Sequence, residues 1–346
     1  MTRHVFTNAN LLDGNSPIQS GTTVIVEGEH ITDVITNGQH PVLRDSDQLY
    51  DLTGKTLMPG MTSGHFHTTY HNLGAEPGFP TAEHPPAFTA YRGLANAQLA
   101  LRAGFTAVVG AGCSYDIDPS LEQAIEQGLF EGPRLEPCSR DILSSYDNLM
   151  PWWLEIPIKS GVDNCDGPDE LRKAVRRNAQ RGARMIKLTT SGGHGVPVSS
   201  GLRVFSFEEI RAAVEAAHDL GLRVRAHVVG KPFILECIRA GVDILDHCDF
   251  MDEECIEAIV EADILVLPSL YLPSKMLDMP RLFGFTLEQT RKEFEWMCNI
   301  LPKAVEAGVK LCVGDDFGTP IAPHGEYGKE LAVYVEHAGI EPLEVI

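Results

Sequence analysis

The sequence predicts an α/β protein in which a (β/α)8 barrel of the TIM type follows a small N-terminal β module. After residue 56 we count eight apolar, strand-like runs that alternate with amphipathic helical patterns. Glycines such as Gly104, Gly221 and Gly241 stand where these helices should stop. Such an alternation is typical of a barrel of parallel strands, and a chain of 346 residues is long enough for one. An open doubly wound sheet is the alternative, but no Gly-x-Gly-x-x-Gly follows an early strand.

The N-terminal segment, residues 1–56, has the pattern of a small β module placed before the barrel at 57–346. Its apolar runs are short, and turn signals such as Asp13-Gly14-Asn15 separate them. The expected strands are His4–Ala9, Thr22–Glu27, His30–Thr36 and Gln48–Asp51. We expect these strands to form a β-sandwich module.

The barrel elements follow in regular order. The predicted strands are Thr56–His67, Thr106–Gly112, Arg134–Arg140, Ala183–Ser191, Arg223–Val228, Val242–His247, Asp263–Leu270 and Lys310–Phe317. The predicted helices lie near Ala90–Ala103, Pro119–Phe130, Pro168–Arg181, Ser206–Leu220, Pro232–Ala240, Glu253–Glu261 and Leu287–Ala307. Ser206 and Glu209 have the spacing of a capping box, which predicts a helix start at that point.

Composition and charge exclude several classes of function. The net charge of −20 opposes binding to nucleic acid or to an anionic membrane, because both require a basic face. No apolar run approaches the roughly 20 residues of a membrane span, and the N-terminus has no signal-peptide pattern. The eight cysteines are scattered without a Cys-x-x-Cys motif, which is typical of reduced thiols. We therefore expect a cytoplasmic protein that acts on a small molecule.

The strand ends carry the residues that point to a metal site. His65 and His67 are separated by one residue at the end of the first barrel strand, so both side chains should lie on one face of it. This is the spacing that two imidazoles need to bind one metal ion. Because barrel active sites lie at the C-terminal strand ends, we compared the other ends. They add Lys187, His227, His247, Asp315 and Asp316. Five of eight strands thus bring a metal-compatible or ionisable group to one rim.

The chain resembles the amidohydrolase superfamily of metal-dependent hydrolases over nearly its whole length. The segment LMPGMTSGHFH is similar to the first-strand metal motif of that family. The segment MIKLTTSGGHG is similar to the fourth-strand motif of the binuclear subgroup, whose members include Xaa-Pro dipeptidase-like and imidazolonepropionase-like proteins. Later segments match in the right order: VRAHVVG, AGVDILDHCDF, VKLCVGDDFGTP and PHGEYGKELAVYVEHAGIEPLEVI.

The resemblance implies a set of metal ligands. His65 and His67 would bind a buried metal together with Asp316, and His227 and His247 would bind a second, more exposed metal. Lys187 would bridge the two after carboxylation of its amine by CO2, because an ammonium group has no lone pair to offer a cation. Imidazole and carboxylate ligands suit zinc, so we expect two zinc ions.

The implied reaction is hydrolysis of a C–N bond in an amide, carbamate or urea. Two cations that share a water lower its pKa, so that hydroxide exists near neutral pH. Asp316 would serve as the general base and acid that passes the proton to the leaving group. We interpret Asp315 as a supporting carboxylate. The resemblance also implies a homo-oligomer.

Departures from the family pattern keep alternative functions open. Val228-Val229-Gly230 after His227 lack the acid expected of a mononuclear deaminase. The segment 144–147 lacks the Gly-Gly-His by which dipeptidase-like members hold a peptide carboxylate. Both departures weigh against these two functions, but a dipeptidase of the Xaa-Pro type, a mononuclear deaminase-like enzyme and a non-catalytic metal-binding relative are kept as alternatives.

Two long segments at the rim are candidates for the substrate pocket. The loop from Ile142 to Asp166 contains adjacent tryptophans, which suggest an apolar wall for an aromatic substrate. A second aromatic loop is expected from Tyr271 to Phe285. The candidate substrate contacts are Tyr70, His71, Tyr146, Trp152, Trp153, His194, Tyr271 and His324.

The resemblance also concerns the C-terminus. Relatives continue beyond the helix in which this chain ends, with strands that return to complete the N-terminal module. By this resemblance, either this sequence is truncated or the protein lacks the second half of that module. If the protein ends at Ile346, we expect residues 4–56 to have unpaired strand edges and low solubility.

Overall fold

The computed structural model describes residues 2–36, 39, 41–72, 84–146, 161–194, 201–279 and 287–346. Contacts divide the chain into two compact units, Met1–Gly60 together with Ile346, and Met61–Val345. The boundary lies four residues beyond the predicted one at residue 56, because strand β5 (Thr56–Leu57) pairs with the first strand of the N-terminal sheet.

The N-terminal unit is a five-stranded sheet in the order β3-β2-β1-β4, with β5 also paired to β1. Its other strands are β1 (Arg3–Leu11), β2 (Gln19–Glu27), β3 (His30–Ile35) and β4 (Gln48–Asp51). The strands β1, β2 and β3 pair antiparallel, whereas β4 and β5 run parallel to β1. Val5, Val24 and Ile25 form its apolar interior, while β4 and most of β3 are exposed. The four predicted strands are thus confirmed.

The second unit contains two parallel sheets. One has the order β6-β7-β8, and the other has the order β10-β9-β11-β12-β13-β14-β15. The strands are β6 (Met61–Phe66), β7 (Phe105–Gly110), β8 (Arg134–Glu136), β9 (Cys138–Leu143), β10 (Val162–Asn164), β11 (Met185–Thr189), β12 (Arg223–Val228), β13 (Ile244–His247), β14 (Leu265–Leu267) and β15 (Lys310–Leu311). All eight predicted strands occur, although the first divides into β5 and β6 and the third into β8 and β9. The Gly64 amide in β6 also donates to the carbonyl of Val313, just after β15, at 2.7 Å.

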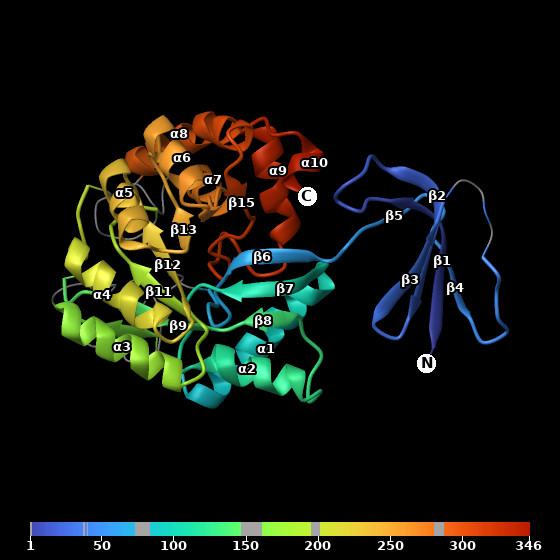
Figure 1. The fold of residues 1–346 in the computed structure, drawn as a ribbon, viewed down its shortest axis with the longest axis horizontal. Coiled ribbons are helices and arrows are strands. Elements are labelled where there is room, and N and C mark those ends of the chain that lie inside the picture. Colours follow the sequence, from blue (N-terminus) through green and yellow to red (C-terminus); the bar gives the residue numbers. More distant parts are fainter. Residues whose placement is uncertain are drawn as a thin grey trace. The chain divides into compact units, whose positions relative to one another are not determined.

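Helices lie around these strands, as Figure 1 shows. They are α1 (Pro86–Arg102), α2 (Ile117–Glu126), α3 (Pro168–Gln180), α4 (Phe207–His218), α5 (Lys231–Ala240), α6 (Glu253–Glu261), α7 (Tyr271–Asp278), α8 (Leu287–Glu306), α9 (Tyr327–Glu336) and α10 (Pro342–Val345). The Ser206–Glu209 capping box is present at the start of α4. Our prediction of a loop over Tyr271–Phe285 is wrong in its first part, because α7 occupies Tyr271–Asp278.

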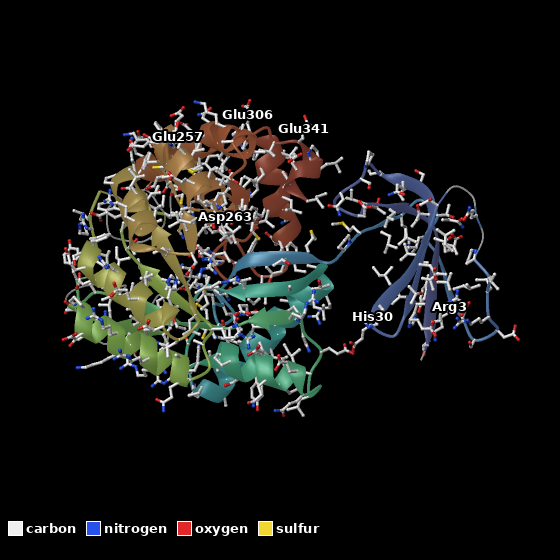
Figure 2. All side chains as sticks on the ribbon, in the orientation of Figure 1. Arg3, His30, Glu257, Asp263, Glu306 and Glu341 are labelled. Atoms are coloured by element: carbon white, nitrogen blue, oxygen red, sulfur yellow. The ribbon has the colours of Figure 1, made fainter. Side chains whose placement is uncertain are left out.

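The apolar faces of strands and helices meet in one large core in the second unit. Every residue of β11 is buried, as expected of a parallel strand that is covered on both sides. Acidic side chains also lie on the outer surface of this unit: Figure 2 shows Glu257 on α6 and Glu306 on α8 among the side chains around the helices, and both are exposed. In the described part of the chain, no helix combines the length and the apolar character that a membrane crossing requires.

One buried carboxylate predicts an unusual dependence of stability on pH. Burial raises the pKa of Asp118 in α2 to about 6, and its Oδ1 has no hydrogen-bond partner. The folded state therefore holds this proton more tightly than the unfolded state, and the wild type loses stability as the pH rises from about 4 to above 6. We expect Asp118→Asn, which can still accept the Cys138 amide, to be more stable than the wild type by about 3 kcal/mol above pH 6.

Urea unfolding at several pH values measures this difference. Well below pH 3.8 the two proteins should be equally stable, since Asp118 is then protonated in both the folded and the unfolded state. A difference that does not change with pH would contradict the prediction.

Candidate metal centre

The predicted ligands converge at the C-terminal ends of the strands. His65 lies at the end of β6, His67 directly after it, Lys187 in β11, His227 in β12 and His247 at the end of β13. Asp316 follows β15. The five basic residues are buried, and the Asp316 side chain is 17% exposed. Strand parallelism thus brings together groups that lie up to 251 positions apart (from 65 to 316) in the sequence.

The first half of the site is built by His65, His67 and Asp316. Their facing atoms, Nε2 of each histidine and Oδ1 of Asp316, lie between 2.9 and 3.1 Å from one another. On His67, Nδ1 lies 3.2 Å from the carbonyl oxygen of Gly112, which can only accept, so Nδ1 carries the proton. The Nε2 lone pair of His67 therefore points at the carboxylate oxygen, an arrangement that a cation would stabilise.

The second half of the site is built by His227 and His247. Their rings meet edge to face with centroids 4.5 Å apart. His227 Nε2 and His247 Nδ1 are buried, and neither has a hydrogen-bond partner. An unsatisfied buried nitrogen costs about 1–3 kcal/mol, and coordination of a metal would remove that cost. His65, His247 and Asp316 also form a group whose ligand atoms could hold one ion.

The electrostatics of the site keep the donors in their metal-binding forms. Burial lowers the pKa of His65, and burial with the positive charge of Lys187 lowers the pKa of His227 to about 3. Burial and His194 hold the pKa of His247 well below its usual range. Burial alone would raise the pKa of Asp316, but His65 holds it well below its usual range. These shifts favour the neutral forms of His65, His227 and His247 and the ionised form of Asp316, which are the forms that bind a metal.

Lys187 lies beside an acid in this structure. Its Nζ donates to Asp246 Oδ2 at 2.6 Å, and both side chains are buried. Asp246 is also bonded to the guanidinium of Arg225, which is fully buried. Sequence reasoning missed Asp246 and Arg225. The signal was present, because Arg225 precedes His227 by two residues on one strand and so shares its face.

Two glycines permit the close approach of backbone around His65. A Cβ on Gly64 would lie 2.3 Å from the Leu267 side chain, and a Cβ on Gly314, at φ +151°, would lie 2.3 Å from the His65 amide nitrogen. Gly64 is thus required by the packing of β6 against β14 and against the segment after β15.

His194 is one of two candidate substrate contacts whose rings stack on predicted ligands. Its ring stacks on His247 with centroids 3.8 Å apart, and its Nδ1 donates to Asp249 Oδ2 at 2.7 Å. Burial alone would lower the pKa of His194, but Asp249 raises it to about 9. The Nε2 atom is buried without a partner. It belongs to a group with Asp315 and Asp316 whose ligand atoms lie within 4.8 Å of one another.

Asp315 and Tyr70 occupy supporting positions. Asp315 accepts the Leu272 amide at 2.9 Å and so ties α7 to the segment that carries Asp316. This geometry agrees with a supporting role for Asp315. Tyr70 stacks on His67 with centroids 3.8 Å apart and an interplanar angle of 2°.

Of the other candidate substrate contacts, His71, Tyr146 and Tyr271 are not brought to the predicted ligands, whereas the His324 ring lies 5.2 Å from that of Phe66, between His65 and His67 in the chain. His71 and Tyr146 are exposed. The Tyr271 hydroxyl donates to Glu326 at 2.6 Å, and His324 Nδ1 lies 2.8 Å from the Tyr327 hydroxyl. Trp152 and Trp153 lie outside the described residues.

An acid that sequence reasoning missed also faces this region. Asp141 in β9 is paired in register with Lys187 in β11. Burial raises the pKa of Asp141, although the positive charges of Lys187 and His67 act to lower it. Its position near the end of the third predicted strand was the signal that could have identified it.

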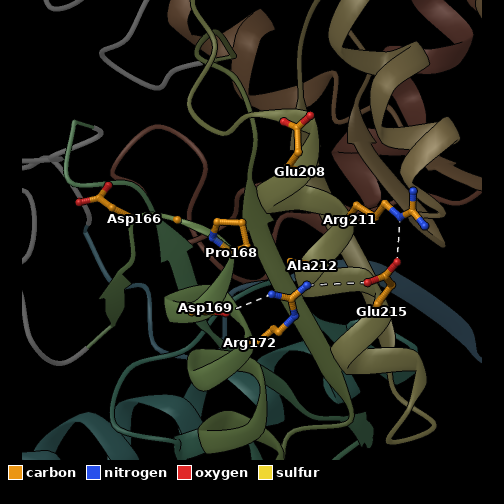
Figure 3. A pocket seen from close by; sticks show the side chains of 9 residues that line it. Asp166, Pro168, Asp169, Arg172, Glu208, Arg211, Ala212 and Glu215 are labelled. Atoms are coloured by element: carbon orange, nitrogen blue, oxygen red, sulfur yellow. Dashed lines mark hydrogen bonds and ion pairs between the residues drawn. The ribbon is translucent and has the colours of Figure 1, made fainter.

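A surface depression lies elsewhere, between the N-terminal ends of α3 and α4 (Figure 3). Its two arginines are paired with acids: Arg172 lies 3.2 Å from Asp169, and Arg211 lies 2.8 Å from Glu215. We assign no role to it, because none of the predicted ligands or candidate substrate contacts lines it.

Comparison with known proteins identifies the family. A model described as the amidohydrolase family matches residues 56–346. The chain belongs to the amidohydrolase family. The match covers all of the predicted ligands, so the family resemblance and the convergence of these residues in space support one another.

Individual relatives of this amidohydrolase are distant. An ochratoxinase from Aspergillus niger is 28% identical over 323 residues, which cover 84% of this chain and 63% of the relative. The chain therefore spans less than two thirds of the length of this curated relative. A prolidase solved with N-methylphosphonate-L-proline has a TM-score of 0.85 and 28% identity, and the comparison covers 99% of this chain and 85% of the prolidase. A Xaa-Pro dipeptidase solved with bound methionine has a TM-score of 0.85 and 26% identity, covering 100% and 86%.

Proposed function

We propose that this amidohydrolase is a metal-dependent hydrolase that cleaves a C–N bond in an amide, carbamate or urea. The observation that supports it best is the meeting of His65 Nε2, His67 Nε2 and Asp316 Oδ1 within 3.1 Å in a buried site. The Nε2 lone pair of His67 and the Asp316 carboxylate oxygen repel one another at 3.0 Å unless a cation lies between them. His227 Nε2 and His247 Nδ1 are also buried without a hydrogen-bond partner. A network of hydrogen bonds within the protein would not explain why these two nitrogens are left unpaired, whereas metal binding would.

The proposed centre holds two divalent ions, of which zinc fits the imidazole and carboxylate donors best. His65, His67 and Asp316 would hold one ion and His227 and His247 the other, with Lys187 as a carboxylated bridge. When bound, the two ions supply an acidified water and polarise the scissile carbonyl. We further propose a cytoplasmic, homo-oligomeric enzyme that acts on a small molecule.

The chain's own residues would move the proton and bind the substrate. Asp316 takes the proton from the attacking water as the C–O bond forms. The same carboxyl then gives the proton to the nitrogen as the C–N bond breaks, so that an amine leaves. His194, fixed by Asp249, presents Nε2 as a hydrogen-bonding group for the substrate. The stacked Tyr70 ring holds His67 in place.

A second candidate is a dipeptidase of the Xaa-Pro type. It is favoured by the names of the two solved relatives, which are a prolidase and a Xaa-Pro dipeptidase. One observation opposes this candidate: Asp141 in β9 lies opposite Lys187 in the register of the sheet. A carboxylate at this position would repel the carboxylate of a dipeptide.

Amine release from a panel of substrates tests the proposal. The panel contains N-aryl amides, aryl carbamates, phenylureas and Xaa-Pro dipeptides, and each is assayed with protein purified in bicarbonate. We expect hydrolysis within the first three classes, its loss on chelation, and its return with zinc and bicarbonate. Hydrolysis confined to the dipeptides would establish the second candidate. Protein that contains two metals and hydrolyses no member of the panel would contradict both.

A further inference from the structure

The floor of the metal centre contains a buried ion pair that the proposed reaction does not use. Arg225 donates through Nε and Nη2 to the two carboxylate oxygens of Asp246, at 3.0 and 2.5 Å. Both side chains are completely buried. Arg225 Nη1 also donates to the carbonyl oxygens of Gly64 and Gly110, at 2.9 and 2.7 Å. The guanidinium therefore joins strands β6, β7, β12 and β13 and fixes the position of the carboxylate.

The clamped carboxylate contacts two of the predicted ligands. Asp246 Oδ2 accepts from Lys187 Nζ at 2.6 Å, and Oδ1 lies 3.4 Å from His65 Nδ1. Arg225 Nη2 lies 3.3 Å from the same ring nitrogen. The bidentate pair with Asp246 already neutralises the charge of Arg225. The contacts of this pair with Lys187 and His65 therefore need a different explanation.

The contact with Lys187 remains possible after carboxylation. When the neutral amine attacks CO2, a C–N bond forms, one C=O π bond opens to a carboxylate, and one N–H proton is lost to solvent. The carbamate nitrogen retains one hydrogen, which can still be donated to Asp246 Oδ2. The new carboxylate must then point away from Asp246, because two anions repel.

We propose that Asp246, clamped by Arg225, is the positioning residue of the metal centre, which holds the Lys187 nitrogen so that the carbamate forms toward the metal ligands. This inference rests on the proposed binuclear function. It predicts that Asp246 controls carboxylation and metal content without touching substrate. Outer partners of metal ligands typically contribute about 10- to 100-fold in metal affinity, so the effect is measurable.

The test compares Asp246→Asn with the wild type after reconstitution with zinc and 13C-bicarbonate. In one orientation of the asparagine amide, its NH2 group replaces Oδ2 and faces the donors of Lys187 and Arg225. In the other orientation the NH2 group replaces Oδ1 and faces His65 and Arg225. We expect the 13C carbamate signal to be lost, the zinc content to fall from two per chain to one or none, and zinc affinity to weaken by about 10- to 100-fold. Retention of the carbamate signal and of both zinc ions would overturn the proposal.

Asp118→Asn is the matched control, because it neutralises another completely buried acid and should leave carbamate and zinc unchanged. Circular dichroism identifies variants that do not fold. If Asp246→Asn does not fold, Asp246→Glu decides: its longer side chain displaces the carboxylate, so a folded protein without carbamate supports the proposal and one with carbamate overturns it. A wild type without carbamate overturns the proposed binuclear function, and this inference with it.

Discussion

Asp316→Asn should lower kcat by about 10²- to 10⁴-fold, which is the contribution expected of a general acid and base. The Asp316 carboxylate lies 2.9 Å from His65 and 3.0 Å from His67, so it is placed both to bind a cation and to exchange a proton beside it. Asparagine keeps an oxygen at the same position but cannot accept the proton at neutral pH. Most of the metal should therefore remain while turnover is lost.

Elemental analysis and steady-state kinetics on the same preparation separate these two roles of Asp316. Asp263→Asn serves as the control, since Asp263 is an exposed acid paired with Lys310 on the surface. Its kcat should equal that of the wild type. A fully active Asp316→Asn protein would contradict the assignment of Asp316, and an inactive protein without metal would restrict its role to metal binding.

Lys187→Ala should reduce the metal content from two ions per chain to one or none. The variant has no group that can become a bridging carbamate, and it leaves Asp246 with one donor fewer. Because a metal ion supplies several kcal/mol of transition-state stabilisation, we expect kcat/KM to fall by about 10³-fold or more. Lys187→Glu should recover part of the metal, since its carboxylate can bridge without CO2.

Metal analysis of protein purified with bicarbonate measures the effect of Lys187→Ala. Lys231→Ala is the control, because Lys231 forms its ion pairs with Asp252 and Glu254 away from the predicted ligands. Two metals in Lys187→Ala would make Lys187 a structural residue. One metal in both wild type and variant would instead favour the mononuclear deaminase-like alternative.

Local sequence determined the elements and the ends of the strands. The period of apolar residues distinguishes strands from helices, and the Ser206–Glu209 spacing specifies the start of α4, since both effects act over a few residues. His65 and His67 converge for the same reason, because alternate residues of a strand share a face. Because the C-terminal ends of parallel barrel strands lie at one rim, Lys187, His227 and Asp316 could also be predicted to lie there.

Only the tertiary structure decided which of these groups touch and what supports them. The bond between Arg225 and Asp246 joins different strands, and the Tyr271 hydroxyl turns to Glu326, 55 positions away, rather than to the predicted ligands. The helix α7 replaces an expected loop, because packing in the core stabilises residues whose local pattern is weak. Partners separated by long loops leave no periodic signal in the sequence, since their distance depends on how the strands pack.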